Sequence, residues 1–143
     1  MAIDVMTFWR CYYHVIWATS HRAPLISSPI EALIINAVRH KSDELGCTVY
    51  AVNTVPDHIH VAVAIPPRLP AADWVRQVKG LTSYEVNSTN PSMAFHWQSG
   101  YGILTFGHRN LSFVTRYIEN QKIHHANGTS MAYLEAVDDP DDA

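Results

Sequence analysis

Residues 56–63 read Pro-Asp-His-Ile-His-Val-Ala-Val, and this stretch decides how the rest of the chain can fold. Pro and Asp favour a tight turn, and the apolar, β-branched run that follows is typical of a strand. Successive side chains of a strand point to opposite faces, so His58 and His60 share one face while Ile59 and Val61 share the other. The stretch therefore predicts a strand with a core face and, opposite it, two neighbouring imidazoles.

The segments on either side alternate between strand and helix patterns. Aromatic and β-branched residues predict strands at 8–19, 47–55, 58–65 and 103–106, and apolar residues at helical spacing predict helices at 28–45, 71–84 and about 110–127. Ser28 is the expected N-cap of the first helix, and Gly128 is expected to end the last one. The first six elements match the β-α-β-β-α-β order of a ferredoxin-like (RRM-like) α+β fold, with an antiparallel sheet and an additional C-terminal helix.

Length and charge limit the organisation of the chain. At 143 residues we expect one domain over residues 1–137, followed by a disordered acidic tail at 138–143. Four aspartates in that tail account for the negative formal net charge of −3, because the first 137 residues carry ten Lys and Arg against nine Asp and Glu. A near-neutral body neither requires nor excludes a nucleic-acid partner, since a local basic patch decides that binding.

The two cysteines and the hydropathy favour a cytoplasmic protein. Cys11 and Cys47 stand alone, without a CxxC partner, which is typical of reduced thiols in the cytosol. No apolar run approaches the roughly 18 residues that a membrane span needs, and residues 1–7 lack the pattern of a signal peptide. We therefore expect no membrane partner.

The last predicted helix carries polar residues that could work with the histidine pair. Tyr117 and Gln121 are four residues apart, so they share a face. A tyrosine becomes a useful nucleophile beside a cation that polarises the electrophile. The Gln121 amide oxygen with His58 and His60 would form an uncharged three-ligand site, which suits Mg²⁺ or Mn²⁺ shared with a substrate phosphate. Taken singly, each pattern is weak, because His-x-His on a strand is also common on surfaces and in packing.

Several motifs together resemble one family along roughly residues 8–127. They are Pro56-Asp57-His58-Ile59-His60, Val78-Lys79-Gly80-Leu81-Thr82-Ser83, Trp97-Gln98-Ser99-Gly100-Tyr101-Gly102, Tyr117-Ile118-Glu119-Asn120-Gln121 and His124-His125, with an opening Tyr13-His14-Val15-Ile16-Trp17-Ala18-Thr19 followed by Arg22 and Pro24. In this order they are similar to the single-tyrosine HUH-type transposases of small bacterial and archaeal insertion sequences, the IS200-like transposase family.

The resemblance implies a function and a role for each matching residue. Tyr117 matches the nucleophile, His58 and His60 the histidine pair of the metal site, and Gln121 the third metal ligand. The family cleaves and rejoins single-stranded DNA at hairpin-marked element ends through a 5′-phosphotyrosine link. Its members are homodimers, in which the tyrosine helix can complete the partner's site.

Other assignments rest on residue type alone. Candidates for contacts with the DNA backbone are Arg76, Lys79, Arg109, Arg116 and Lys122. Trp74, Trp97 and Tyr101 could stack on bases, although core packing is the simpler expectation, and His14, His96 and the pair His124-His125 are expected to be structural.

Two other functions stay open. A domesticated or inactive relative would bind hairpin DNA or RNA without cleaving it. A structural zinc protein would need a closed four-ligand site, and the motif region offers no thiolates for one.

Overall fold

The computed structural model describes residues 7–137, so the acidic tail predicted at 138–143 lies outside the described residues. The strands are β1 (Tyr12–Ala18), β2 (Thr48–Val55), β3 (His58–Ala64) and β4 (Gly102–Phe106). The helices are α1 (Ser28–Glu44), α2 (Ala71–Thr89), α3 (Leu111–Glu119), α4 (Gln121–Asn127) and α5 (Ala132–Glu135), with 3₁₀ turns η2 (Ser20–Arg22), η3 (Pro91–Met93) and η4 (His108–Asn110).

The four strands form one antiparallel sheet in the order β2-β3-β1-β4. This order, reached through α1 and α2, confirms the predicted ferredoxin-like α+β fold. The turn at residues 56–57 joins β2 to β3 as expected, and Val55 pairs with His58 beside it. On its other side β3 pairs with β1, and Ile16 of β1 lies opposite His60. The strand that carries the histidines therefore has a neighbour on each side and is an inner strand of the sheet.

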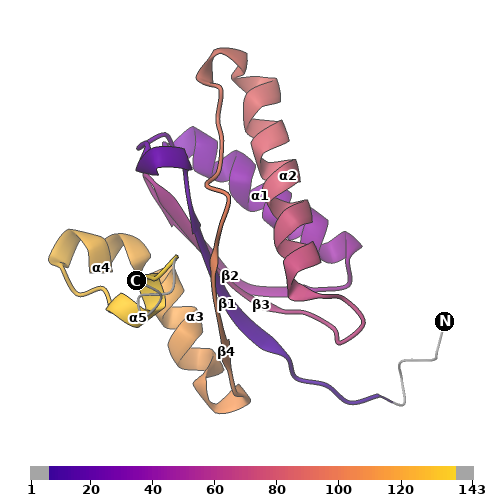
Figure 1. The fold of residues 1–143 in the computed structure, drawn as a ribbon. Coiled ribbons are helices and arrows are strands. Elements are labelled where there is room, and N and C mark those ends of the chain that lie inside the picture. Colours follow the sequence, from indigo (N-terminus) through magenta and orange to yellow (C-terminus); the bar gives the residue numbers. More distant parts are fainter. Residues whose placement is uncertain (1–6, 138–143) are drawn as a thin grey trace.

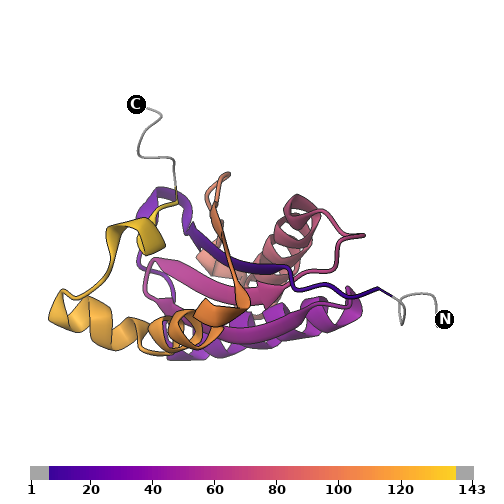
Figure 2. The ribbon, with the colours of Figure 1, turned by 90° about the horizontal axis from the view of Figure 1, so that it is seen from below.

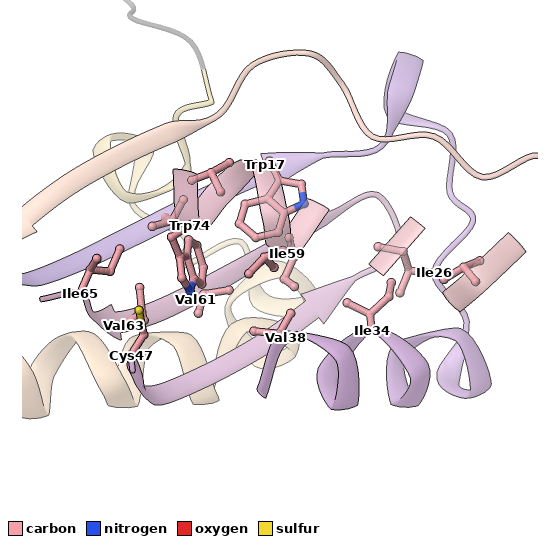
Figure 3. Close-up of a cluster of buried hydrophobic side chains, with 14 of the residues drawn as sticks. Trp17, Ile26, Ile34, Val38, Cys47, Ile59, Val61, Val63, Ile65 and Trp74 are labelled. Atoms are coloured by element: carbon pink, nitrogen blue, oxygen red, sulfur yellow. The ribbon is translucent and has the colours of Figure 1, made fainter. Parts of the chain in front are cut away.

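The two faces of the sheet serve different purposes. Ile59, Val61 and Val63 point into the main core between the sheet and the helices α1 and α2, where Trp17 of β1 and Trp74 of α2 also pack (Figure 3). The opposite face carries the histidines and receives α3, whose Val114 and Ile118 lie against Ala51 and Ala62. Figure 1 shows the result, with α1 and α2 on one side of the sheet and α3, α4 and α5 on the other. The alternation of the histidine strand thus separates packing from the polar face.

The helix boundaries differ from the predictions at three places. Ser27, rather than Ser28, is the N-cap of α1, and its side chain makes no capping bond. α2 runs on to Thr89 instead of ending near residue 84, because Val86 continues the buried stripe eight residues after Val78. The helix predicted from about 110 to 127 is two helices, broken at Asn120. There the Asn53 side-chain amide donates to the carbonyls of Ile118 and Glu119, which a continuous helix would use itself.

The chain after α4 turns back toward the sheet. Gly128 ends α4 in the left-handed conformation, at φ 67°, as predicted. Figure 2 shows α4 running beside the sheet and the following segment returning over it to form α5, which the sequence did not predict. The return brings backbone against backbone: a Cβ built on Gly102 of β4 would overlap the Ala136 carbonyl oxygen and lie 2.9 Å from its carbonyl carbon. Glycine at 102 therefore permits this close approach.

None of the helices in the described part of the chain has the length and apolar character of a membrane span.

Candidate active site

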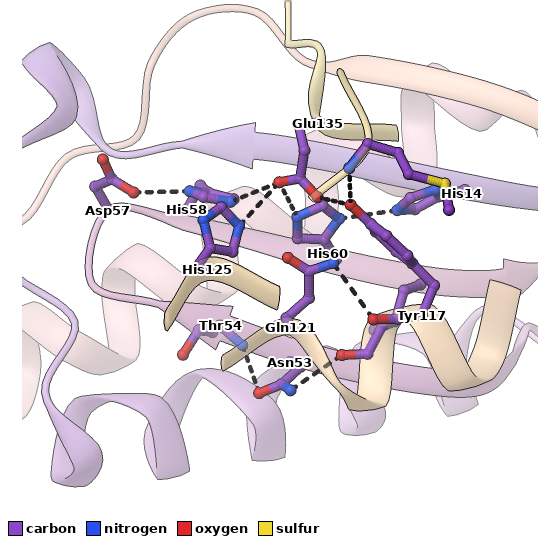
Figure 4. Close-up of polar contacts among 12 residues, drawn as sticks. His14, Asn53, Thr54, Asp57, His58, His60, Tyr117, Gln121, His125 and Glu135 are labelled. Carbon is purple, nitrogen blue, oxygen red and sulfur yellow. Dashed lines mark hydrogen bonds and ion pairs between the residues drawn. The ribbon is translucent and has the colours of Figure 1, made fainter. Parts of the chain in front are cut away.

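The histidine pair lies on the face of β3 that α3 and the C-terminal segment cover. His58 and His60 are both buried, and their ring centroids are 5.1 Å apart. The Asp57 carboxylate accepts a hydrogen bond from Nδ1 of His58 at 2.7 Å, and the other ring nitrogen, Nε2, points over the sheet (Figure 4). Nδ1 of His60 shares a hydrogen bond with Nε2 of His14 at 2.9 Å. Each histidine is therefore oriented through Nδ1 and presents Nε2 to the same space.

Glu135 occupies that space. Its Oε1 lies 3.2 Å from Nε2 of His58, 2.9 Å from Nε2 of His60 and 3.1 Å from Nε2 of His125. Donor atoms of these four residues all lie within 4.8 Å of one another, which makes them a group that could hold a metal ion. β3, α4 and α5 contribute to this group, so it forms only when the chain returns after Gly128.

Tyr117 lies on the other side of the same carboxylate. Its hydroxyl donates a hydrogen bond to Oε2 of Glu135 and accepts one from the Met131 backbone N–H at 2.8 Å. The side chain is only 3% exposed, and its ring stacks on His124 with centroids 4.6 Å apart. The tyrosine that the sequence singled out and the histidine pair are thus linked through one carboxylate within a single chain.

Gln121 is buried next to these groups. Its Nε2 lies 3.4 Å from the Tyr117 carbonyl oxygen, to which it donates, and its Oε1 has no hydrogen-bond partner among the described residues. Figure 4 shows the amide directed toward the histidines rather than toward solvent. A buried amide oxygen without a donor is costly unless a cation or water satisfies it. This oxygen therefore fits the third-ligand position that the sequence predicted.

Burial decides the protonation state of His14 and His60, which face each other on neighbouring strands. Burial, reinforced by the neighbouring His60, lowers the pKa of His14 to about 3. Burial also lowers the pKa of His60, although the hydrogen bond to Glu135 and its charge act in the opposite direction. Both rings are consequently neutral near pH 7, which is the state that can ligate a metal.

The pKa values of Tyr117 and Glu135 shift in opposite directions. Burial, together with the hydrogen bond to the negative Glu135, raises the pKa of Tyr117 to about 12. Burial would raise the pKa of Glu135, but the hydrogen bonds from His58, His60 and Tyr117 outweigh it and hold that pKa well below its usual range. The carboxylate is therefore ionised and the phenol neutral until a positive charge enters the site.

Comparisons with known proteins identify the family of this chain. Residues 7–121, most of the chain, match the family described as "Transposase IS200 like". The chain belongs to the IS200-like transposase family. A relative of this transposase is the ISDra2 transposase TnpA of Deinococcus radiodurans, 24% identical over 119 residues, which are 79% of this chain and 85% of the relative. The transposase for insertion sequence element IS200 of Salmonella typhimurium is 23% identical over 121 residues, covering 80% of this chain and 79% of that protein.

Two solved structures share the transposase fold. A crystal structure described as a candidate transposase of Deinococcus radiodurans superposes with a TM-score of 0.66 at 24% identity, covering 80% of this chain and 92% of that one. The structure of a REP-associated tyrosine transposase bound to a REP hairpin superposes with a TM-score of 0.61 at 13% identity, covering 85% and 70%. At these identities the likeness concerns the fold.

The predicted DNA-contact residues of the transposase fall into two groups. Lys79 donates to the carbonyl oxygens of Gln98 at 2.6 Å and Gly100 at 3.0 Å, and Lys122 pairs with Glu31 at 2.6 Å. These two lysines hold the chain's own segments together. Arg76, Arg109 and Arg116 are exposed and stay predictions for DNA contact. Of the aromatic candidates, Trp74 belongs to the core, and Trp97 and Tyr101 pack against it.

Three residues of the site escaped sequence reasoning or were underrated. His125 had a usable signal, since it follows Gln121 by four residues and Tyr117 by eight. His14 had one too, because alternation puts it on the face of β1 that matches His60. Glu135 had none: it stands in a four-residue helix beyond a turn, and only the tertiary fold places it in the site.

Proposed function

We propose that this transposase cleaves and rejoins single-stranded DNA through a 5′-phosphotyrosine intermediate on Tyr117. One observation carries the proposal: the Tyr117 hydroxyl and the Nε2 atoms of His58 and His60 converge on the two oxygens of one carboxylate. A carboxylate carries two oxygens on one centre, as a phosphodiester carries its two non-bridging oxygens. The Tyr117 hydroxyl and the two Nε2 atoms thus face a common position, where a substrate phosphate would lie beside or in place of the Glu135 carboxylate.

The chemistry needs few groups. The Tyr117 oxygen attacks the scissile phosphorus in line and gives up its phenolic proton to water. The bond from phosphorus to the 3′ oxygen breaks, and that oxygen takes a proton from water to become a 3′-hydroxyl. A 3′-hydroxyl then attacks the phosphotyrosine, restores a phosphodiester and releases the tyrosine, so no nucleotide cofactor is required. A divalent ion, Mg²⁺ or Mn²⁺, held by His58, His60 and Gln121 would offset the charge on the phosphate. Positioning and charge stabilisation supply most of the catalysis.

The proposed substrate is single-stranded DNA at hairpin-marked ends of an insertion sequence, and the proposed assembly is a homodimer. The hairpin-bound structural relative and the family support the substrate. For the dimer, support comes from β4, an edge strand of the sheet on which Ile103 and Leu104 are exposed. Unpaired strand edges with apolar side chains favour association with another chain. In the single chain Tyr117 is linked to its own histidines through Glu135.

A second function, hairpin binding without cleavage, is favoured by one feature of the site. Tyr117 is buried, its hydroxyl is engaged by both Met131 and Glu135, and its pKa is raised to about 12 by burial and by Glu135. A phenol held in this way is a poor nucleophile. An active transposase must therefore free the Tyr117 hydroxyl from these contacts or bring a positive charge next to it. A protein that only binds hairpins needs neither change.

Covalent trapping separates the two functions. A 5′-extended hairpin oligonucleotide is incubated with the full chain and Mn²⁺ or Mg²⁺, and a protein–DNA adduct is sought on a denaturing gel. The transferase predicts an adduct that Tyr117→Phe abolishes and that Tyr84→Phe, at a tyrosine 66% exposed on α2, leaves unchanged. An adduct that persists in Tyr117→Phe would refute the assignment of the nucleophile. Binding of the hairpin without any adduct would favour the second function.

A further inference from the structure

We propose that His125 and Glu135 are ligands of the same metal ion as His58 and His60, so that the segment after the tyrosine helix completes the metal centre. The inference deepens the proposed function and rests on it only for the role of His58 and His60 as ligands. It adds a third imidazole and a carboxylate to the site of His58, His60 and the Gln121 amide oxygen.

The distances fit a shared ion. An ion bound tetrahedrally at about 2.0–2.1 Å from nitrogen and oxygen needs ligand atoms about 3.3 Å from one another. The three Nε2 atoms lie 3.2, 2.9 and 3.1 Å from Oε1 of Glu135. Small outward movements of the carboxylate would open the centre to an ion. Three ring nitrogens, two from β3 and one from α4, therefore face one oxygen from α5 at spacings close to this value, and all four ligand atoms lie within 4.8 Å of one another.

The remaining ring nitrogens support ligation through Nε2. Nδ1 of His58 is bonded to Asp57 at 2.7 Å, and Nδ1 of His60 to His14 at 2.9 Å. Metal-bound histidines characteristically give their other nitrogen to a carboxylate or a similar partner, which fixes the tautomer and the ring orientation. Asp57 and His14 are therefore placed as outer partners of this centre.

The donor set also indicates which ion binds. Mg²⁺ prefers six oxygen ligands, whereas imidazoles suit first-row transition ions. Three histidines, one carboxylate and the partnerless Oε1 of Gln121 favour an ion such as Mn²⁺, Co²⁺ or Zn²⁺ over Mg²⁺. The carboxylate supplies negative charge that a site of two imidazoles and an amide lacks, which strengthens the hold on a divalent cation.

Glu135 would connect the ion to the tyrosine. Its Oε1 faces the three histidines while its Oε2 accepts the Tyr117 hydroxyl hydrogen bond, and the Met131 N–H donates to the same hydroxyl at 2.8 Å. The segment that carries the ligand thus also positions the nucleophile. Loss of the Glu135 carboxylate is expected to weaken the binding of the ion and to free the Tyr117 hydroxyl.

Metal binding tests the proposal without DNA. Isothermal titration of the full chain with Mn²⁺, after treatment with EDTA and buffer exchange, should give one ion per chain. His125→Ala and Glu135→Gln should each weaken the affinity at least about tenfold, the lower end of what even outer partners cost. His40→Ala and Glu119→Gln, at exposed positions, serve as matched controls and should bind as the unmodified chain does. Mg²⁺ should bind more weakly than Mn²⁺.

Two results would overturn the proposal. Unchanged affinity in both variants would restrict the ligands to His58, His60 and Gln121, and tighter binding in Glu135→Gln would show that the carboxylate competes with the ion. If either variant fails to fold, the unmodified chain loaded with Co²⁺ decides, because three ligated imidazoles give three shifted ring N–H signals by NMR and two give two. A chain that binds metal as expected but forms no Tyr117 adduct contradicts the proposed function and leaves this ligand set standing.

Discussion

Gly102→Ala should detach the segment that carries Glu135 while leaving the sheet intact. The new Cβ would overlap the Ala136 carbonyl oxygen and lie 2.9 Å from its carbon and 3.2 Å from Cα of Val137, all of them backbone atoms. Ordinary carbon–carbon contacts begin near 3.5 Å, and the overlap with the carbonyl oxygen is more severe than the two carbon contacts, so the segment must retreat by more than about 1 Å or leave. Alanine itself is compatible with the strand, where Gly102 pairs with Ile16.

The expected loss can be sized from the segment's own anchor. Leu134 is 4% exposed, and burial of a leucine contributes about 1.5–3 kcal/mol. Its release would make opening of residues 129–137 about 10- to 100-fold more frequent. Hydrogen exchange measured by mass spectrometry should therefore show faster exchange in that peptide, including the Met131 N–H that Tyr117 now protects.

Gly107→Ala is the matched control for this variant, because no atom lies within 4 Å of a Cβ at that position directly after β4. Mn²⁺ affinity should fall in Gly102→Ala, to the degree expected for Glu135→Gln, and should not fall in Gly107→Ala. If exchange in residues 129–137 is the same in both variants, the close approach at Gly102 does not hold the segment, and the placement of Glu135 in the site loses its support.

Three other perturbations test separate parts of the molecule. Asn53→Ala should lower the free energy of unfolding in urea by about 1–3 kcal/mol, because Asn53 holds two carbonyls at the end of α3 at 3.0 and 3.1 Å; a neutral result would remove it as the anchor of the tyrosine helix. In EDTA, the contribution of His14 to the free energy of unfolding should be complete above pH 6.5 and should decrease from pH 6.5 to pH 3. Burial lowers the pKa of His14 to about 3 in the folded chain, so the unfolded chain takes up the proton first as the pH falls. The slope is at most about 1.4 kcal/mol per pH unit for this group, and His14→Gln should flatten it. Arg116→Gln should weaken single-stranded DNA binding by anisotropy and reduce the salt slope by about 0.7, whereas Lys79→Met should lower stability instead; an unchanged slope would exclude Arg116 from phosphate contact.

Sequence reasoning succeeded where local pattern and tertiary structure agree. The alternation in residues 58–64 predicted both the strand and its two faces, and the structure confirms that His58 and His60 share the face opposite Ile59 and Val61. The ferredoxin-like order followed from the spacing of strand and helix patterns, and it too is confirmed. In each case the decisive information lies within a few residues along the chain.

The failures occurred where distant residues decide the local structure. The break at Asn120 depends on Asn53, more than sixty residues earlier, whose amide takes the carbonyls that would continue the helix. The close approach of Ala136 to Gly102 joins two segments that lie far apart in the sequence, and no hydrophobic pattern connects them. Lys79 and Lys122 have partners within the chain that the sequence did not predict, backbone carbonyls and Glu31, while their contact with DNA stays a prediction. Composition and spacing carry no information on such contacts.

The break at Asn120 also clarifies how one short region can supply a nucleophile and several ligands. Tyr117, Gln121 and His125 are spaced by four, and on a straight helix such a row would extend over about 12 Å. A metal centre is smaller, since the donor atoms of His125 and its three companions lie within 4.8 Å. α3 ends at Glu119 and α4 begins at Gln121, so the row is divided between two helices, and the return of the chain after Gly128 brings Glu135 to both Tyr117 and His125. Under the proposed ligand set, Asn53 acts on the site indirectly, because its amide takes the last carbonyls of α3 where the row divides between Tyr117 and Gln121.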